Sequence, residues 1–182
     1  MAESTTMPKR GLVHVYTGAG KGKTTAALGV ALRALGWGMR VCIVQFIKGY
    51  AEIGEAKFAA EMGERFVLKQ FAVDHAREID EEKVRARRGA AGAAMSYAQE
   101  VVSGEQFEIV ILDEINNAIH HGLIDEARVL ALIEHKPDAV ELILTGRNAP
   151  QSVIDAADYV TDLRLVKHPF QKGVPARNGI DY

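Results

Sequence analysis

The stretch YTGAGKGKTTAALG, residues 16–29, carries the pattern that decides the fold. A phosphate-binding loop has the spacing glycine, four residues, then Gly-Lys-Ser/Thr, and Gly22, Lys23 and Thr24 match its second half. Thr17 stands where the first glycine is expected. The alternating glycines of the stretch let the backbone curl so that its N–H groups face an anion. The stretch therefore predicts a phosphate-binding loop, with a glycine-rich turn that holds no ligand as the alternative.

Apolar, β-rich runs alternate with longer helical patterns along the chain. Six runs predict strands, at 11–17, 40–47, 65–72, 107–114, 139–146 and 159–168. Helical patterns lie at 24–35, 78–103 and 124–136, a short helix opens at Pro150, and 48–55 is predicted as a loop. This order predicts a single-domain α/β fold of the P-loop NTPase-like (RecA-like) class, with a mostly parallel sheet and helices on both faces. We expect residues 1–10 to form a flexible N-terminal tail and residues 11–182 to form the domain.

The composition narrows the classes of function. The 182-residue chain has a net charge of −2 and no overall basic excess, which argues against nucleic acid as a partner. Cys42 is the only cysteine, so an internal disulfide and a cysteine metal cluster are excluded. No apolar run reaches the ~18 residues of a membrane span, and the polar start MAESTTMPKR has no signal-peptide core. We therefore expect a cytoplasmic protein without a membrane partner.

Candidate carboxylates lie where a predicted strand ends, which is where parallel α/β sheets bind their ligands. In IVILDE, residues 109–114, Asp113 is placed beside the Mg²⁺ that Thr24 would hold, with a helix N-cap as the alternative role. Glu114 would activate water in an ATPase. In a transferase it would hold metal or orient substrate, and complementing a helix dipole is the third possibility.

Cationic side chains are predicted at the same edge of the sheet. Arg147 follows the strand at 139–146, where it would stabilise triphosphate charge or form a structural salt bridge. Lys21 would contact phosphate or solvent. Gln45 and Lys48 follow another strand, with a solvated charge as the alternative for Lys48.

The histidines show no spacing typical of a zinc site. His120 and His121 are adjacent and would point in different directions on a helix, and His14 alternates with strand residues as a structural side chain would. No acid–base pair is indicated beside the phosphate loop. An ATP-hydrolysing enzyme and a nucleotide-binding module without chemistry are therefore both alternatives to a group transferase.

Four stretches resemble one family, the phosphate-loop ATP:corrinoid adenosyltransferases. They are YTGAGKGKTTAALGVALRALGWGMRVCIVQFIKG, VILDEINNAI, LTGRNAP and LRLVKHPFQKGVPARNGIDY. QFIKG and the last stretch narrow the match from the phosphate-loop superfamily to this family, in which the threonine before the loop is normal. The resemblance implies that a reduced Co(I) corrinoid attacks the 5′ carbon of ATP and that the whole triphosphate leaves, in adenosylcobalamin synthesis or salvage.

The resemblance also implies roles for individual residues. Lys23, Glu114 and Arg147 are implied as catalytic residues, and Thr24, Asp113 and Glu114 as the Mg²⁺ site. The residues implied to bind the nucleotide are Thr17, Gly18, Ala19, Gly20, Lys21, Gly22, Lys23, Thr24, Thr25 and Arg147. Family members work as homodimers, and an electron donor such as a flavoprotein supplies Co(I), so both partners are implied here.

Two departures from the family pattern set further expectations. Relatives often carry a longer N-terminal segment that covers the corrinoid, whereas only residues 1–10 precede the first predicted strand. Relatives also often place Phe and Trp in the loop that displaces the lower ligand of cobalt, whereas KQFAVDHAREID, residues 69–80, contains Phe71 and no tryptophan. We therefore expect a preference for corrinoids without a strong lower base when the reaction starts from Co(II), with His75 as a candidate polar contact on the lower face.

Overall fold

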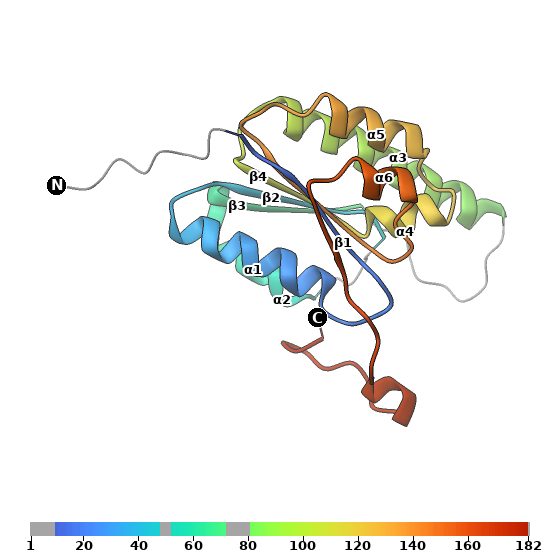
Figure 1. The fold of residues 1–182 in the computed structure, drawn as a ribbon. Helices are drawn as coiled ribbons and strands as arrows, with labels where there is room; N and C mark the ends of the chain where they lie inside the picture. The colour runs from blue at the N-terminus through green and yellow to red at the C-terminus, as the bar shows by residue number, and fades with distance from the viewer. Residues whose placement is uncertain (1–9, 48–51, 72–80, 182) are drawn as a thin grey trace.

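A six-stranded parallel sheet forms the centre of the molecule (Figure 1). The computed structural model describes residues 10–47, 52–71 and 81–181. The strand order is β3-β2-β4-β5-β1-β6. The strands are β1 (Val13–Thr17), β2 (Val41–Gln45), β3 (Phe66–Gln70), β4 (Ile109–Asp113), β5 (Glu141–Thr145) and β6 (Tyr159–Asp162). β2 and β4 are buried along their whole length, which is why their sequences are continuous apolar runs.

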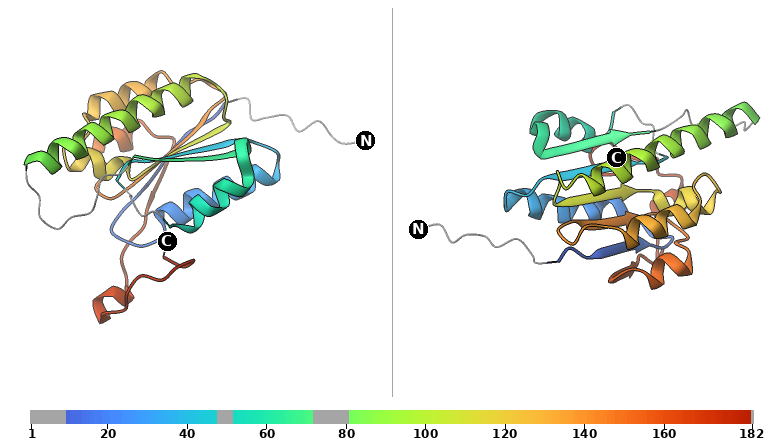
Figure 2. Two further views of the ribbon diagram at one scale, coloured as in Figure 1. Left: turned by 180° about the vertical axis from the view of Figure 1, so that it is seen from behind. Right: turned by 90° about the horizontal axis from the view of Figure 1, so that it is seen from above.

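Helices cover both faces of the sheet (Figures 1 and 2). One face carries α1 (Lys23–Gly36) and α2 (Gly54–Met62), and the other carries α3 (Glu81–Ser103), α4 (Ile115–His120), α5 (Glu126–Glu134) and α6 (Gln151–Asp155). Two apolar cores result, because alternate residues of each strand point to opposite faces. The predicted α/β fold, a parallel sheet between two helical layers, is confirmed.

Three elements differ from the sequence-based prediction. The segment 48–55 was predicted as a loop, but α2 begins at Gly54. Ala59 and Met62 of α2 pack on the core, but none of the residues of α2 is fully buried, so its apolar pattern is weak. α4 was not predicted, because its six residues are too few to show helical periodicity. β6 ends at Asp162 and not at residue 168, since the chain there leaves β1 and passes the phosphate loop, where Gly20 N donates to Leu163 O.

The chain after β6, residues 163–181, is called here the C-terminal segment. It contains a short 3₁₀ helix (Pro169–Lys172) and runs away from the sheet before it returns to the phosphate loop (Figure 1). Of the predicted N-terminal tail, only Arg10 lies within the described residues. Within the described ranges, no helix is long and apolar enough to cross a membrane.

Candidate functional site

The phosphate loop, residues 17–24, depends on glycine for its curvature and for its packing. Gly18 has a positive φ of 97°, which L side chains rarely adopt. A Cβ atom at Gly18 would lie 2.0 Å from Asp162 Oδ1, and one at Gly20 would lie 2.5 Å from Leu163 O. The loop is thus pressed against the chain that follows β6, and alanine would not fit at either position.

Lys23 places its charge inside this loop. It is the first residue of α1, and Gly22, the N-cap, has a φ of 117°. The Lys23 side chain is only 7% exposed, and its Nζ donates at 2.8 Å to both Gly18 O and Gly20 O. Carbonyl partners offset the cost of burying the ammonium group. Together with the N–H groups at the start of α1, the ammonium forms a positively charged cradle suited to phosphate oxygens.

Asp113 is the centre of a buried hydrogen-bond network that joins four elements. Its Oδ1 accepts from Thr24 Oγ1 of α1 at 2.8 Å and from Thr145 Oγ1 of β5 at 2.6 Å. Its Oδ2 accepts from Gln45 Nε2 of β2 at 3.2 Å. Asp113 is itself the last residue of β4 and is fully buried, whereas the N-cap of α4 is Glu114. Asp113 therefore does not have the alternative role of a helix cap.

The oxygen atoms of this network fit a magnesium ion. A hydroxyl from Thr24 and a carboxylate from Asp113 lie 2.8 Å apart, and Glu114 follows in the chain. Mg²⁺ prefers oxygen ligands and keeps several waters or phosphate oxygens in its shell, so a small protein donor set suits it. In the described ranges, no three or more His, Cys, Asp or Glu side chains gather into a closed metal site. These residues can therefore offer an open metal site, which a bound nucleotide would complete.

Glu114 has an unusual backbone. Its φ of 65° and ψ of 19° are left-handed, a conformation that costs a non-glycine residue about 1–2 kcal/mol. Its backbone N–H donates to Thr145 Oγ1 at 3.0 Å, and its side chain makes no cap hydrogen bond to α4. Glu114 lines the cavity described below, whereas the preceding Asp113 stays buried.

Arg147 lies in the exposed turn after β5 and lines the same cavity. Its backbone N–H donates to Asn117 Oδ1 of α4, and Ala149 N donates to Thr17 Oγ1 at 3.2 Å. These two bonds fix the turn against α4 and against the phosphate loop. Among the residues that the structure describes, Arg147 forms no ion pair, so the predicted alternative of a structural salt bridge is not found there.

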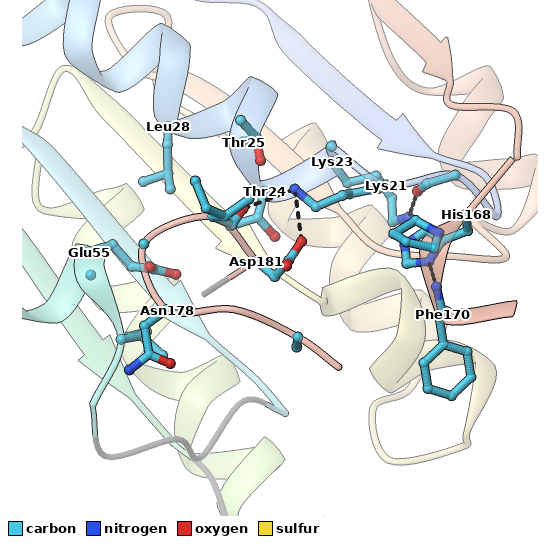
Figure 3. A pocket seen from close by; sticks show the side chains of 18 of the residues that line it. Lys21, Lys23, Thr24, Thr25, Leu28, Glu55, His168, Phe170, Asn178 and Asp181 are labelled. Atoms are coloured by element: carbon cyan, nitrogen blue, oxygen red, sulfur yellow. Dashed lines mark hydrogen bonds and ion pairs between the residues drawn. The ribbon is translucent and has the colours of Figure 1, made fainter. Parts of the chain in front are cut away.

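A cavity of about 1140 Å³ lies over the phosphate loop (Figure 3). The loop and α1 form one wall, the start of α2 forms a second, and the C-terminal segment forms a third. Its lining includes Lys21, Lys23, Thr24, Thr25, Leu28, Ile53, Glu55, Glu114, Arg147, His168, Phe170, Asn178 and Asp181. The site thus combines the cations Lys21, Lys23 and Arg147 with apolar surface from two further elements.

Lys21 connects the phosphate loop to the C-terminal segment. Its Nζ donates to Ile180 O at 3.0 Å and lies 3.4 Å from Asp181 Oδ1 (Figure 3). A hydrogen bond from Arg177 lowers the pKa of Asp181, and Lys21 adds to this effect. Phosphate and solvent were the two partners considered for Lys21 from the sequence. The contact with the C-terminal segment was missed, and only the family resemblance of that stretch pointed to its importance.

Several candidates lie outside the cavity lining. Thr17, Gly18 and Ala19 belong to the loop but do not line the cavity, which begins at Gly20. Lys48 and His75 fall outside the described residues. Phe71, considered for the lower face of a corrinoid, packs on the sheet core, with its ring centroid 5.7 Å from that of Tyr97.

Of the described histidines, only His168 lines the cavity. His14 Nε2 hydrogen-bonds Glu141, as expected for a structural side chain on β1. His120 and His121 lie in edge-to-face contact with their ring centroids 5.2 Å apart. His168 lines the cavity and accepts a hydrogen bond from Phe170 N, which caps the 3₁₀ helix.

The sheet order, the phosphate loop and the buried aspartate at the end of β4 define a P-loop NTPase-like nucleotide-binding protein. Two solved structures share this fold. The flagellar accessory protein FlaH from Methanocaldococcus jannaschii has a TM-score of 0.58 and 12% identity over 85% of this chain and 71% of that chain. The KaiC-like protein PH0186 from Pyrococcus horikoshii has a TM-score of 0.54 and 19% identity over 87% and 75%.

Within this class, the chain belongs to the ATP:corrinoid adenosyltransferase family BtuR/CobO/CobP, whose family model matches residues 9–182. A corrinoid adenosyltransferase of Pseudomonas aeruginosa is 38% identical over 96% of this chain and 85% of its own length. Corrinoid adenosyltransferases of Sinorhizobium sp. and Escherichia coli K12 are 36% and 34% identical, over 98% and 96% of this chain and 84% and 87% of theirs. The resemblance found in the sequence is confirmed.

Proposed function

We propose that this protein transfers the 5′-deoxyadenosyl group of ATP to the Co(I) of a reduced corrinoid, releasing tripolyphosphate. The observation that carries the proposal is a family match across residues 9–182 that includes a structurally complete phosphate loop. In the reaction, an electron pair of Co(I) forms the cobalt–carbon bond at C5′. The C5′–O5′ bond breaks, and its electrons leave with the triphosphate.

The cations around the loop support this chemistry. Negative charge grows on the triphosphate as the C5′–O5′ bond breaks, and preorganised positive groups lower the barrier by stabilising it. Lys23 and the N–H groups at the start of α1 lie where the triphosphate would bind, and Arg147 lines the cavity beside them. The nucleophile comes from the corrinoid, so no protein base has to activate it. ATP hydrolysis, with Glu114 orienting water, is the second candidate and is not favoured by the family match.

Magnesium is part of this proposal. Thr24, Asp113 and Glu114 would hold the ion, which would neutralise part of the triphosphate charge. The support is the oxygen donor set at the loop, where Thr24 Oγ1 already donates to Asp113 Oδ1. The nucleotide-binding role of residues 17–25 is likewise a proposal, supported for Lys21 to Thr25 by their place in the cavity lining.

The remaining expectations rest on the family resemblance. A homodimer, an electron donor such as a flavoprotein and a cytoplasmic location stay predictions, as do the roles of residues 1–10 as a tail and 11–182 as the domain. The preference for corrinoids lacking a strong lower base also stays a prediction, since residues 72–80 fall outside the described part of the chain.

A turnover experiment tests the proposal. The protein is mixed with ATP, Mg²⁺ and chemically pre-reduced cobinamide or cobalamin, and the adenosylated corrinoid is measured by mass spectrometry. We expect product that depends on both ATP and the protein, at a rate strongly reduced in Lys23→Ala. Arg33→Ala is the control, because Arg33 is an exposed cation near the end of α1 and does not line the cavity. ATP consumption without any adenosylated corrinoid would favour the hydrolase instead.

A further inference from the structure

Thr145 contacts both Asp113 and Glu114 through one hydroxyl group. It is the last residue of β5, it is fully buried, and it does not line the cavity. Its Oγ1 donates to Asp113 Oδ1 at 2.6 Å and accepts from the backbone N–H of Glu114 at 3.0 Å. A hydroxyl has one proton to donate and lone pairs to accept with, so the two bonds use both capacities at once.

The bond to the Glu114 amide holds a strained backbone. Glu114 is left-handed without being glycine, and such residues persist only where their surroundings fix them. The strain has a consequence for the site, because the turn at Glu114 separates two adjacent carboxylates, leaving Asp113 buried and Glu114 at the cavity. Without the Thr145 hydroxyl, the turn would lose a partner for its backbone N–H.

The bond to Asp113 fixes the other carboxylate. Asp113 Oδ1 also accepts from Thr24 Oγ1, so the same oxygen ties β5 to the first turn of α1. Gln45 holds the second oxygen. The carboxylate is therefore oriented from three sides, and Thr145 supplies the shortest of these bonds.

We propose that Thr145 is a positioning residue that sets the orientation of Asp113 and the left-handed turn of Glu114 for the transfer reaction. This inference rests on the proposed function for its effect on turnover, but its structural part does not. Thr145 acts through the Asp113 carboxylate and the Glu114 backbone, and it does not line the cavity in which the substrates would bind.

The test compares Thr145→Val, which keeps the shape and removes the hydroxyl, with Thr145→Ser, which keeps the hydroxyl. A lost hydrogen bond to a charged group corresponds to about a 10- to 100-fold change. We expect Thr145→Val to lower kcat by this factor while the Kd of ATP without Mg²⁺, set by the phosphate loop, stays within about threefold. Thr145→Ser should restore kcat to within about threefold of the unaltered protein. Thr161→Val, at an exposed threonine on β6, is the matched control and should leave both constants unchanged.

Amide hydrogen exchange at Glu114, followed by NMR, provides a readout that does not depend on turnover. We expect this N–H to be protected in the unaltered protein and in Thr145→Ser, and to exchange faster in Thr145→Val. The measurement on the unaltered protein remains decisive if the valine variant does not fold, because an unprotected Glu114 N–H there overturns the inference. A valine variant with unchanged kcat also overturns the inference. A valine variant whose kcat, ATP affinity and melting temperature all fall together overturns it as well, because the effect is then a general loss of structure.

The two failures can be distinguished. If the unaltered protein makes no adenosylated corrinoid from pre-reduced substrate, the proposed function fails, while the Glu114 exchange comparison still decides the role of Thr145. If product forms and the valine variant makes it as fast as the unaltered protein, only the Thr145 inference fails.

Discussion

At the scale of single residues, the site depends on charge placed where water is scarce. The Lys23 ammonium is almost fully buried, and two of its hydrogen-bond acceptors, Gly18 O and Gly20 O, are neutral carbonyls. A neutral partner offsets less of the desolvation cost of an ammonium group than an anion does. A triphosphate in the loop would add an anion beside Lys23, so binding energy would be gained at a group that the fold has already positioned.

This predicts the effect of Lys23→Ala on ATP binding. Losing one charge-assisted contact should cost about 1.5–3 kcal/mol, which is roughly a 10- to 100-fold rise in the Kd of ATP. Isothermal titration calorimetry measures it, with Arg33→Ala as the control that should bind normally. Unchanged affinity in a folded Lys23→Ala protein would show that Lys23 does not bind the triphosphate.

Asn116 is a residue that lowers the stability of the fold. The side-chain amide of Asn116 in α4 is fully buried, and no hydrogen-bond partner for it is found in the described part of the chain. Such a group costs about 1–3 kcal/mol. We therefore expect Asn116→Leu, of similar shape, to raise the free energy of unfolding by about 1 kcal/mol in urea denaturation. Asn117→Leu should lower it, because Asn117 Oδ1 accepts from Arg147 N. A destabilised Asn116→Leu protein would mean that the amide has a partner in solution.

At the scale of elements, the sequence predicted the strands that are buried on both faces and the helix that follows the phosphate loop. β2 and β4 are continuous apolar runs, and α1 follows a loop whose glycines are recognisable by spacing. α2 and α4 could not be predicted in this way, because no residue of α2 is fully buried and α4 is too short to show a period. Asp113 could be placed from its position after a buried strand, but its bonds to Thr24 and Thr145 depend on how β5 and α1 pack beside it.

The pairing of β1 with β5 carries a pH-dependent contribution to stability. Glu141 Oε2 accepts from Leu12 N at 2.8 Å, and Oε1 bonds His14 Nε2, with Lys136 nearby. Burial opposes ionisation of Glu141, but the bonds from His14 and Leu12 hold its pKa below the usual 4.5 on balance. A lowered pKa means that the carboxylate stabilises the fold above pH 4.5 and that this stabilisation is lost as the pH falls through the folded-state pKa.

Glu141→Gln tests this contribution. The variant should be less stable than the unaltered protein by about 1 kcal/mol at neutral pH, and the difference should shrink as the pH falls below 4.5. Urea denaturation of both proteins across this range measures it. A difference that stays constant with pH would show that the charge of Glu141 does not contribute.

At the scale of the whole molecule, the site is assembled from distant parts of the chain. The carboxyl ends of the parallel strands bring the loop, Asp113 and Arg147 to one edge, which the fold class predicts. The contact between the C-terminal segment and Lys21 could not be predicted from a local sequence pattern, because Lys21 and its partner Ile180 are 159 residues apart in the chain. The glycines and prolines of this segment are typical of irregular structure and do not show where the segment packs.

The contact between Lys21 and Asp181 should restrain the C-terminal segment. We expect Asp181→Asn to increase the rate of tryptic cleavage after Lys172 and Arg177, because the variant keeps both cleavage sites but weakens the ion pairs that hold the segment. Mass spectrometry of a timed digest measures the rate. Asp155→Asn, at an exposed aspartate on α6, should cleave like the unaltered protein. Equal rates in all three would show that the ion pairs do not restrain the segment.

The inorganic product of the reaction shows which bond of ATP is broken. Phosphorus NMR of a completed reaction with ATP, Mg²⁺ and pre-reduced Co(I) corrinoid distinguishes cleavage at C5′ from cleavage at phosphorus. Transfer of the adenosyl group predicts tripolyphosphate in the same amount as the adenosylated corrinoid, because the C5′–O5′ bond is the one that breaks. ADP and inorganic phosphate in equal amounts, with no adenosylated corrinoid, would show that the protein hydrolyses ATP and does not transfer its adenosyl group.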